Sequence, residues 1–146
     1  MRTAIITTLF IGMLSCQKEE KALPQLYLDL RINGKRHDFI WEEMDGMWDG
    51  GNGSAYINCV SDQYEQFSLY LPGVNHTGIL SDIGMHNISY SDAIGFRSSG
   101  ISNAMVEVKQ KTAHQIAGSF QAGLICEGSV DEEVQIAGDF VIITPH

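Results

Sequence analysis

Positively charged side chains are scarce in this sequence. Its 146 residues include nine Lys and Arg against 18 Asp and Glu, which gives a formal net charge of −9. Non-specific nucleic-acid binding needs a basic face that displaces counterions from phosphates, so this balance excludes that class of function. It also excludes electrostatic docking on anionic lipid. With 44% hydrophobic and 18% charged residues, the chain has the composition of a folded domain rather than a disordered one.

Long hydrophobic runs are also missing. The most apolar stretch, residues 4–14, spans 11 residues, well short of the ~20 that a membrane-crossing helix needs. Arg2 precedes it, and a basic start followed by a short apolar run is typical of a secretory signal peptide. The sequence therefore predicts a signal peptide over residues 1–15 that is removed during export.

The end of that segment resembles the lipobox of bacterial lipoproteins. Met13, Leu14 and Ser15 lead directly into Cys16, and the resemblance implies cleavage before Cys16 and acylation of its sulfur and amine. Two or three acyl chains anchor a protein on a membrane stably, whereas one chain is marginal. Residues 16–24 then form a polar tether. The alternative is an ordinary signal peptide with an incidental cysteine.

The residues after Cys16 resemble the export signal of lipoproteins in Bacteroidota, a Gln-Lys-acid-acid stretch. The matching residues are Gln17, Lys18, Glu19 and Glu20. The resemblance implies a lipid-anchored protein on the bacterial outer membrane that faces the cell surface. The alternative is that these charged residues only keep the tether solvated.

Helical periodicity is absent after the signal segment, and apolar residues alternate with polar ones instead. Such alternation indicates half-buried strands, and Asn33-Gly34 between two alternating stretches is a strong hairpin signal. The pattern predicts one all-β domain over residues 25–146, an antiparallel sandwich or flattened barrel of about eight strands. The expected strands cover residues 26–32, 35–41, 54–60, 65–71, 86–91, 103–110, 114–126 and 132–143.

The body of the chain, residues 25–146, also resembles small Bacteroidota lipoproteins of unknown function. LRINGKRHDF is similar to their opening strand–turn–strand, and LYLPGVNHTGIL to their middle segment. Their closing hairpin carries two Gly-x-Phe strands, matched by Gly118, Phe120, Gly138 and Phe140. The resemblance implies a fold and a location, and it brings no catalytic residues.

Cysteine is rare, with three residues in the chain. If Cys16 is lipidated, Cys59 and Cys126 remain, each on the apolar face of an expected strand. They can form a disulfide, which persists in an oxidising compartment, or they can be two separate buried thiols. A metal site is not indicated, because neither cysteine has the CxxC or His spacing of a zinc ligand set.

Catalytic motifs are missing as well. The sequence has no Gly-x-Ser-x-Gly elbow, no His-Glu-x-x-His and no phosphate-binding loop. The five histidines show no ligand spacing and are most simply read as surface residues: His37, His76, His86, His114 and His146. A catalytic triad assembles from distant residues, so sequence spacing alone does not decide its presence.

Residues 41–54 are the most informative segment for function. Trp48, Trp41 and Met47 could form a contact loop for a sugar or a protein partner. Trp48 is expected to be exposed among glycines, whereas Trp41 continues the alternation of the preceding strand. The oxygen ligands of Asp45, Asp49 and Asn52 make a second reading, a calcium site without the EF-hand spacing. The third is a solvated connection whose Trp residues fold back on the core.

These observations predict a non-enzymatic, surface-tethered binding or interaction module that needs no cofactor and contacts a glycan or a protein. One alternative is a small glycan-directed hydrolase of the cell envelope. Glycosidases need two carboxylates across a cleft, and the densest acidic group comprises Glu42, Glu43, Asp45 and Asp49. The other is an acidic inhibitor or immunity factor that binds a basic partner, with an affinity that salt weakens.

Overall fold

The computed structural model describes residues 25–37 and 40–145. Cys16, the four export-signal residues and His146 therefore lie outside the described residues. The described part contains ten strands and no helix. Their bounds are β1 Gln25–Ile32, β2 Lys35–Arg36, β3 Trp41–Asp49, β4 Ser54–Ser61, β5 Gln66–Leu71, β6 Gly78–Leu80, β7 Ile88–Ser91, β8 Ser98–Lys111, β9 Gln115–Cys126 and β10 Ser129–Ile143. Within these ranges, no helix with the length and hydropathy of a membrane span was found.

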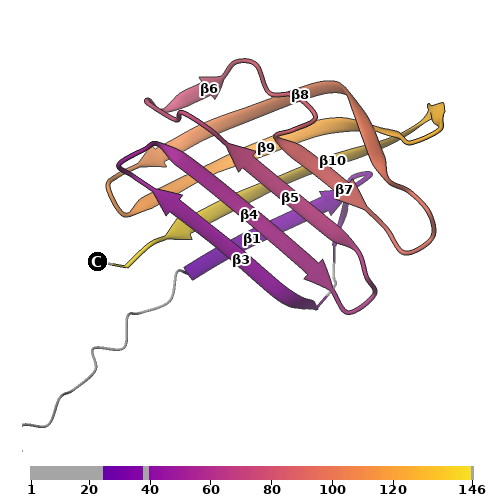
Figure 1. Ribbon diagram of the computed structural model, residues 1–146, viewed down its shortest axis with the longest axis horizontal. Coiled ribbons are helices and arrows are strands. Elements are labelled where there is room, and N and C mark those ends of the chain that lie inside the picture. The colour runs from indigo at the N-terminus through magenta and orange to yellow at the C-terminus, as the bar shows by residue number, and fades with distance from the viewer. Residues whose placement is uncertain (1–24, 38–39, 146) are drawn as a thin grey trace, which may run out of the picture.

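The strands form two antiparallel sheets that face each other. The six-stranded sheet has the order β2-β1-β10-β9-β8-β6, and the four-stranded sheet has the order β3-β4-β5-β7. Figure 1 shows the strands of one sheet crossing those of the other rather than running along them. The prediction of an all-β antiparallel fold is confirmed, and of its two forms the open sandwich is the one observed, because neither sheet closes into a barrel.

One hydrophobic core fills the space between the sheets. Each sheet contributes every second residue of its strands, as the alternation in the sequence predicts. Phe67 of β5 stacks on Phe120 of β9 with ring centroids 5.1 Å apart, so the two sheets meet through these rings. The buried apolar side chains include Ile57, Leu69, Leu71, Ile88, Val106, Ile116, Leu124, Ile136, Phe140 and Ile142.

The hairpin between β1 and β2 has the predicted two-residue turn. Asn33 and Gly34 have φ angles of 49° and 77°, and Ile32 pairs with Lys35 across the turn. Both central residues of a type I′ turn need positive φ, which Asn and Gly adopt readily. The second strand is shorter than predicted, because β2 ends at Arg36.

The two Gly-x-Phe strands lie side by side, and each Phe covers the glycine opposite. Gly118 pairs with Phe140, and Gly138 pairs with Phe120. A Cβ at Gly118 would lie 3.0 Å from Cζ of Phe140, and a Cβ at Gly138 would lie 2.7 Å from Cζ of Phe120. Both contacts are closer than packed carbon atoms allow. The glycines therefore make room for two buried rings that complete the core.

Two strands lie where the sequence pattern predicts none. β6 is a three-residue edge strand. The other is β3, which occupies most of the segment expected to be a loop, so that only residues 50–53 form a turn before β4. Gly46 and Trp48 point inward from β3, and a Cβ at Gly46 would lie 3.0 Å from Cδ2 of Leu26. A glycine at a core-facing position interrupts the apolar alternation, which is why the pattern did not reveal this strand.

The expectation that Trp48 is exposed is wrong. Trp48 is 1% exposed and belongs to the core between the sheets. Its indole Nε1 donates a hydrogen bond to the carbonyl of Thr112 at 2.8 Å, which satisfies the polar group of a buried ring. The glycines around Trp48 suggested a loop. Gly50, Gly51 and Gly53 belong instead to the tight turn before β4, and Gly46 lies on β3 where that strand passes close to Leu26. Trp48 is therefore a structural residue.

Candidate functional site

The three predicted contact residues do not share one surface. Successive side chains on a strand point to opposite faces, so Met47 points outward where Trp48 points inward. Met47 is 41% exposed. Trp41 lies half-buried at the other end of β3, where its ring stacks on His37 with centroids 5.4 Å apart. The structure thus leaves Met47 exposed and assigns both tryptophans to packing.

The candidate calcium ligands are engaged in local hydrogen bonds. Asp49 accepts hydrogen bonds from the backbone of Asn52 and Gly51, which lowers the pKa of Asp49, and its other oxygen accepts one from the Asn52 amide at 2.6 Å. Asp45 accepts a hydrogen bond from the Tyr56 hydroxyl at 3.0 Å. Across residues 25–37 and 40–145, three or more His, Cys, Asp or Glu side chains nowhere come together as a metal site.

The acidic residues of this segment have a clear place in the fold. β3 is an edge strand of the four-stranded sheet and therefore exposes one row of backbone N–H and C=O groups. Charged side chains on such a strand hinder pairing with a strand of another molecule. Glu42, Glu43 and Asp45 are exposed on β3 in this way.

Cys59 and Cys126 are two separate buried thiols. Cys59 lies on β4 and Cys126 on β9, in different sheets. Burial, with a smaller contribution from the charge of Asp45, raises the pKa of Cys59 to about 12. The thiolate is the reactive form of cysteine, so Cys59 is inert at neutral pH. Of the two alternatives left open by the sequence, the structure has the unbridged one.

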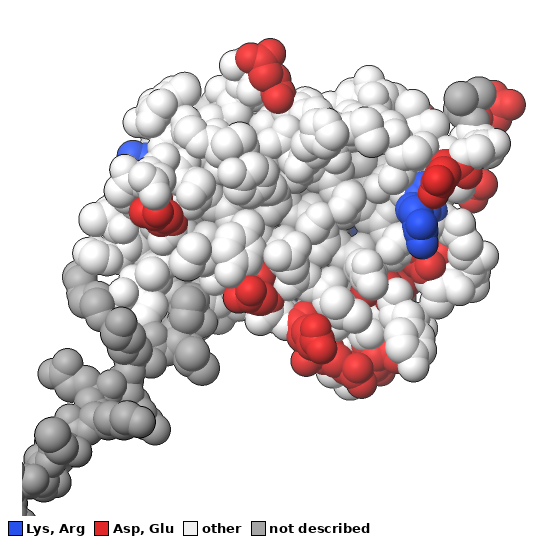
Figure 2. Space-filling view, in the orientation of Figure 1, with Lys and Arg blue, Asp and Glu red and all other residues white. Residues whose placement is uncertain are grey.

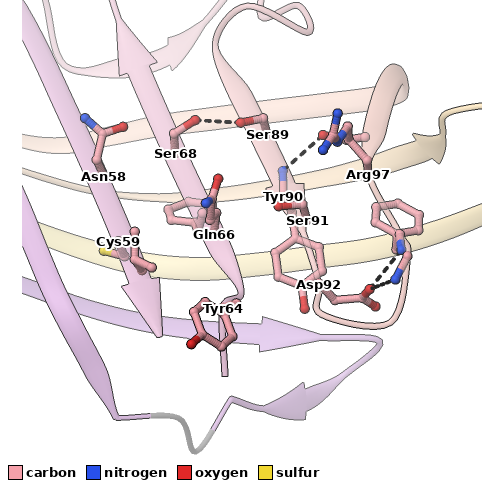
Figure 3. A pocket seen from close by; sticks show the side chains of 15 residues that line it. Asn58, Cys59, Tyr64, Gln66, Ser68, Ser89, Tyr90, Ser91, Asp92 and Arg97 are labelled. Atoms are coloured by element: carbon pink, nitrogen blue, oxygen red, sulfur yellow. Dashed lines mark hydrogen bonds between the residues drawn. The ribbon is translucent and has the colours of Figure 1, made fainter. Parts of the chain in front are cut away.

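The four-stranded sheet carries a polar hollow on its outer face. Its volume is about 610 Å³, and β4, β5 and β7 form its floor. The polar floor residues are outward-pointing members of these strands, Asn58, Gln66, Ser68, Ser89 and Ser91 (Figure 3). The apolar Val60, which pairs with Gln66, points to the same face and also lines the hollow. Together with Tyr64, which is 80% exposed, and the 92–97 loop, they define the polar hollow.

The strand register arranges the floor in two rows. Asn58 pairs with Ser68, and Ser68 pairs with Ser89, whose hydroxyl lies 2.6 Å from that of Ser68. In the second row, Gln66 pairs with Ser91. Directly paired residues have side chains on the same face. The hollow therefore presents neighbouring hydroxyl and amide groups, each able to donate and to accept hydrogen bonds.

The loop that borders the hollow is held by one aspartate. Oδ1 of Asp92 accepts hydrogen bonds from the backbone N–H groups of Ile94, Gly95 and Phe96 at 3.0, 3.0 and 2.8 Å. Phe96 is buried and its ring lies 6.0 Å from that of Tyr90. These contacts fix the loop, and they bring Arg97 opposite Ser91 in an isolated β-bridge.

The electrostatic character of this face differs between its floor and its rim. The five floor residues are uncharged. Acidic side chains lie mostly around the margin of the face, and few basic ones are seen (Figure 2). A neutral floor of hydroxyl and amide groups with an exposed aromatic ring suits a ligand rich in hydroxyl groups.

Beside the hollow, a buried polar network joins three segments of the chain. His37 Nε2 lies 2.5 Å from Oε2 of Glu65, and the hydroxyl of Tyr90 donates to Oε1 of Glu65 at 3.1 Å. The backbone N–H of Glu65 donates to Oγ of Ser61 at 3.0 Å. The network thereby connects the segment after β2, the β4–β5 turn and β7. Tyr64, at the wall of the hollow, directly precedes Glu65 and has a φ of 63°.

Burial shifts the titration of this network. It is the largest cause that raises the pKa of Glu65, and the charges of Asp92 and Asp62 add to it, while the hydrogen bond from Tyr90 acts in the opposite direction. Burial and the neighbouring Glu65 raise the pKa of Tyr90 well above its usual range. The hydroxyl of Tyr90 thus stays protonated and acts as a hydrogen-bond donor.

Sequence reasoning missed both the polar hollow and the network. A signal for the network exists, because Glu65 is in phase with Phe67, Leu69 and Leu71 and hence points inward. His37, read as a surface residue, has a side chain only 3% exposed. The floor of the hollow is the polar half of predicted strands. The floor assembles because β7 pairs with β5, although β6 lies between them in the sequence. The alternation of residues within a strand does not predict which strands pair.

Comparison of the chain with protein-family models, with curated proteins and with solved structures gave no match.

Proposed function

We propose that this protein is a surface-tethered lipoprotein that acts as a binding module for a glycan, with the polar hollow as its binding site. The observation that carries the proposal is the floor itself, two rows of uncharged hydroxyl and amide groups beside the exposed ring of Tyr64. Ring hydroxyls of a sugar can exchange hydrogen bonds with such groups, and its apolar face can pack on an aromatic ring.

The lining of the hollow supports binding rather than hydrolysis of the glycan. Canonical glycosidases use two carboxylates, one on each side of the scissile bond. Among the described residues that line the hollow, Asp92 is the one carboxylate, and its Oδ1 already accepts three backbone hydrogen bonds. The raised pKa of Glu65 is explained chiefly by its burial, and Glu65 does not line the hollow.

The binding proposal is tested by replacing Ser68 and Ser89 with Val in the full chain. Valine suits a strand and removes both hydroxyls. The affinity for a bound glycan is expected to fall about 30-fold, since each hydrogen bond contributes ~1 kcal/mol. Wild type and variant are compared on a glycan array, followed by titration calorimetry with the glycan retained. Ser119→Val, on the opposite sheet, is the matched control and should bind as wild type does.

An unchanged affinity in the Ser68/Ser89 double variant, with its thermal unfolding also unchanged, would refute the assignment of the site. Equal losses in the double variant and in Ser119→Val would show a general effect on the fold and would refute it as well.

The anchoring half of the proposal rests on Cys16 and the residues around it. We infer lipidation of Cys16 and export to the outer face of the outer membrane through Gln17, Lys18, Glu19 and Glu20. Cys16→Ala is expected to abolish incorporation of a labelled fatty acid, because acylation needs the cysteine sulfur. Cys59→Ala is the control and should keep the label. Label retained by Cys16→Ala would exclude the lipoprotein assignment.

A further inference from the structure

The polar hollow has a cation at one end. Arg97 pairs with Ser91, and Ser91 pairs with Gln66. The side chain of Arg97 therefore continues the second row of the floor. Figure 3 shows Arg97 at the border of the hollow, beyond Ser89 and Ser91. Among the described Lys and Arg residues, Arg97 is the one that lines the hollow.

The guanidinium of Arg97 retains its hydrogen-bonding capacity. Its side chain is 77% exposed, and its Nε lies 3.9 Å from Oε2 of Glu127. That distance exceeds the range of an N–H···O hydrogen bond, so the contact is a loose ion pair of two exposed groups. Asp92, the acid that lines the hollow, directs Oδ1 to the backbone of its own loop. The donors of Arg97 are thus available to a ligand.

The opposite end of the rows is acidic. Glu43 pairs with Val60 and Asp45 pairs with Asn58, so both carboxylates continue the floor on the β3 side. A ligand bound along the rows therefore meets negative charge at one end and Arg97 at the other. Because the chain as a whole carries a formal charge of −9, a negative group on the ligand is favoured only at the Arg97 end.

The chemistry of Arg97 narrows the kind of negative group. A guanidinium is planar and offers parallel N–H donors that match the two oxygens of a carboxylate. The single positive charge of Arg97 can pair with one negative charge, and the nearby carboxylates of Asp92 and Glu127 oppose a second one, so a carboxylate suits this end better than the double charge of a phosphate monoester.

Resting on the proposed function, we infer that the polar hollow binds an acidic saccharide of the uronic-acid type. The sugar carboxylate pairs with Arg97, and the ring hydroxyls hydrogen-bond to the floor residues, with Ser68 and Ser89 among them. Arg97 is the residue that determines specificity for acidic over neutral glycans. The remaining floor residues contribute to binding of both kinds.

The test uses the full chain and a panel of oligosaccharides that each carry one terminal uronic acid, each beside its carboxyl-reduced counterpart, which keeps the linkages and loses the charge. Titration calorimetry at low salt should show about tenfold tighter binding of the acidic form, the size typical of a hydrogen bond to a charged group. High salt should reduce the difference in affinity between the acidic and the carboxyl-reduced form. Arg97→Gln should bind both forms with equal affinity, whereas Arg97→Lys should retain part of the preference.

Lys109→Gln, on the six-stranded sheet, is the matched charge control and should keep the wild-type preference. Equal binding of both forms by the wild type, or a preference that survives in Arg97→Gln, would overturn the inference and leave glycan binding itself standing. A counterpart with one terminal sulfate that binds more tightly than the uronic-acid form would overturn the choice of a carboxylate. Failure of the whole panel to bind would overturn the inference, while the wider glycan array decides the proposed function separately.

Discussion

Trp48→Ala is expected to lower the free energy of unfolding by about 3–5 kcal/mol, the usual cost of truncating a buried aromatic residue. Such a loss is a large part of the stability of a small domain. The ring fills the core between the sheets, and its Nε1 satisfies the carbonyl of Thr112. Truncation therefore leaves both a cavity and an unpaired carbonyl. Thermal and denaturant unfolding of the full chain measure the effect.

Two further variants separate the contributions at this position. Trp48→Phe keeps most of the packing and removes the indole N–H, so it should cost less than the alanine variant. Trp41→Ala removes a half-buried ring that stacks on His37, and it should cost less than Trp48→Ala. If Trp41→Ala proves more damaging than Trp48→Ala, the assignment of Trp48 to the core is wrong.

Glu65→Ala is expected to destabilise the fold by about 2–5 kcal/mol, because each buried group that loses a hydrogen bond costs about 1–3 kcal/mol. Glu65 accepts from Tyr90 and contacts His37, and both of these contacts are lost in this variant. Glu65→Gln keeps an oxygen for Tyr90 and should be far less damaging. Equal losses in the two variants would show that the hydrogen bonds of Glu65 do not hold this end of the sandwich.

The difference in stability between the wild type and Glu65→Gln should depend on pH, and the raised pKa of Glu65 fixes the sign of that dependence. The pKa of Glu65 is raised above its ordinary value of 4.5, chiefly by burial. The folded state thus binds more protons than the unfolded state as the pH rises above 4.5, and the Glu65 contribution to stability falls over that range. Relative to Glu65→Gln, the wild type should lose stability with rising pH. Asp49, whose pKa is lowered, titrates alike in both proteins and cancels in the difference. A wild type that gains stability relative to Glu65→Gln as the pH rises would contradict the raised pKa of Glu65.

The sequence contains enough information for most of the fold, because alternation and turn chemistry are local properties. Asn33 and Gly34 predict their turn from backbone preferences alone, and the φ angles agree. Phe67 and Leu69 reveal which face of β5 is buried. Trp48 was misplaced because Gly46, two residues before it, faces the core and has no side chain to mark the inward phase.

The candidate site could not be predicted from local sequence patterns, for a different reason. Ser68 and Ser89 are ordinary outward residues on their own strands and become a paired row only through the register of β5 with β7. Arg97 joins the other row, that of Gln66 and Ser91, through a single bridge to Ser91. A site made of neutral side chains from several strands carries no motif, so it becomes visible only when the strand order is known.

The position of β10 between β1 and β9 has a consequence for how the chain folds. Asn33 and Gln135 are hydrogen-bonded although they are 102 residues apart in the chain. Contacts of such long separation slow folding, because a large loop must close before they can form. The hairpins β3–β4 and β8–β9 can form early, but β1 has no place in its sheet until the last strand has been synthesised. A nascent chain therefore stays incompletely folded until β10 has been synthesised.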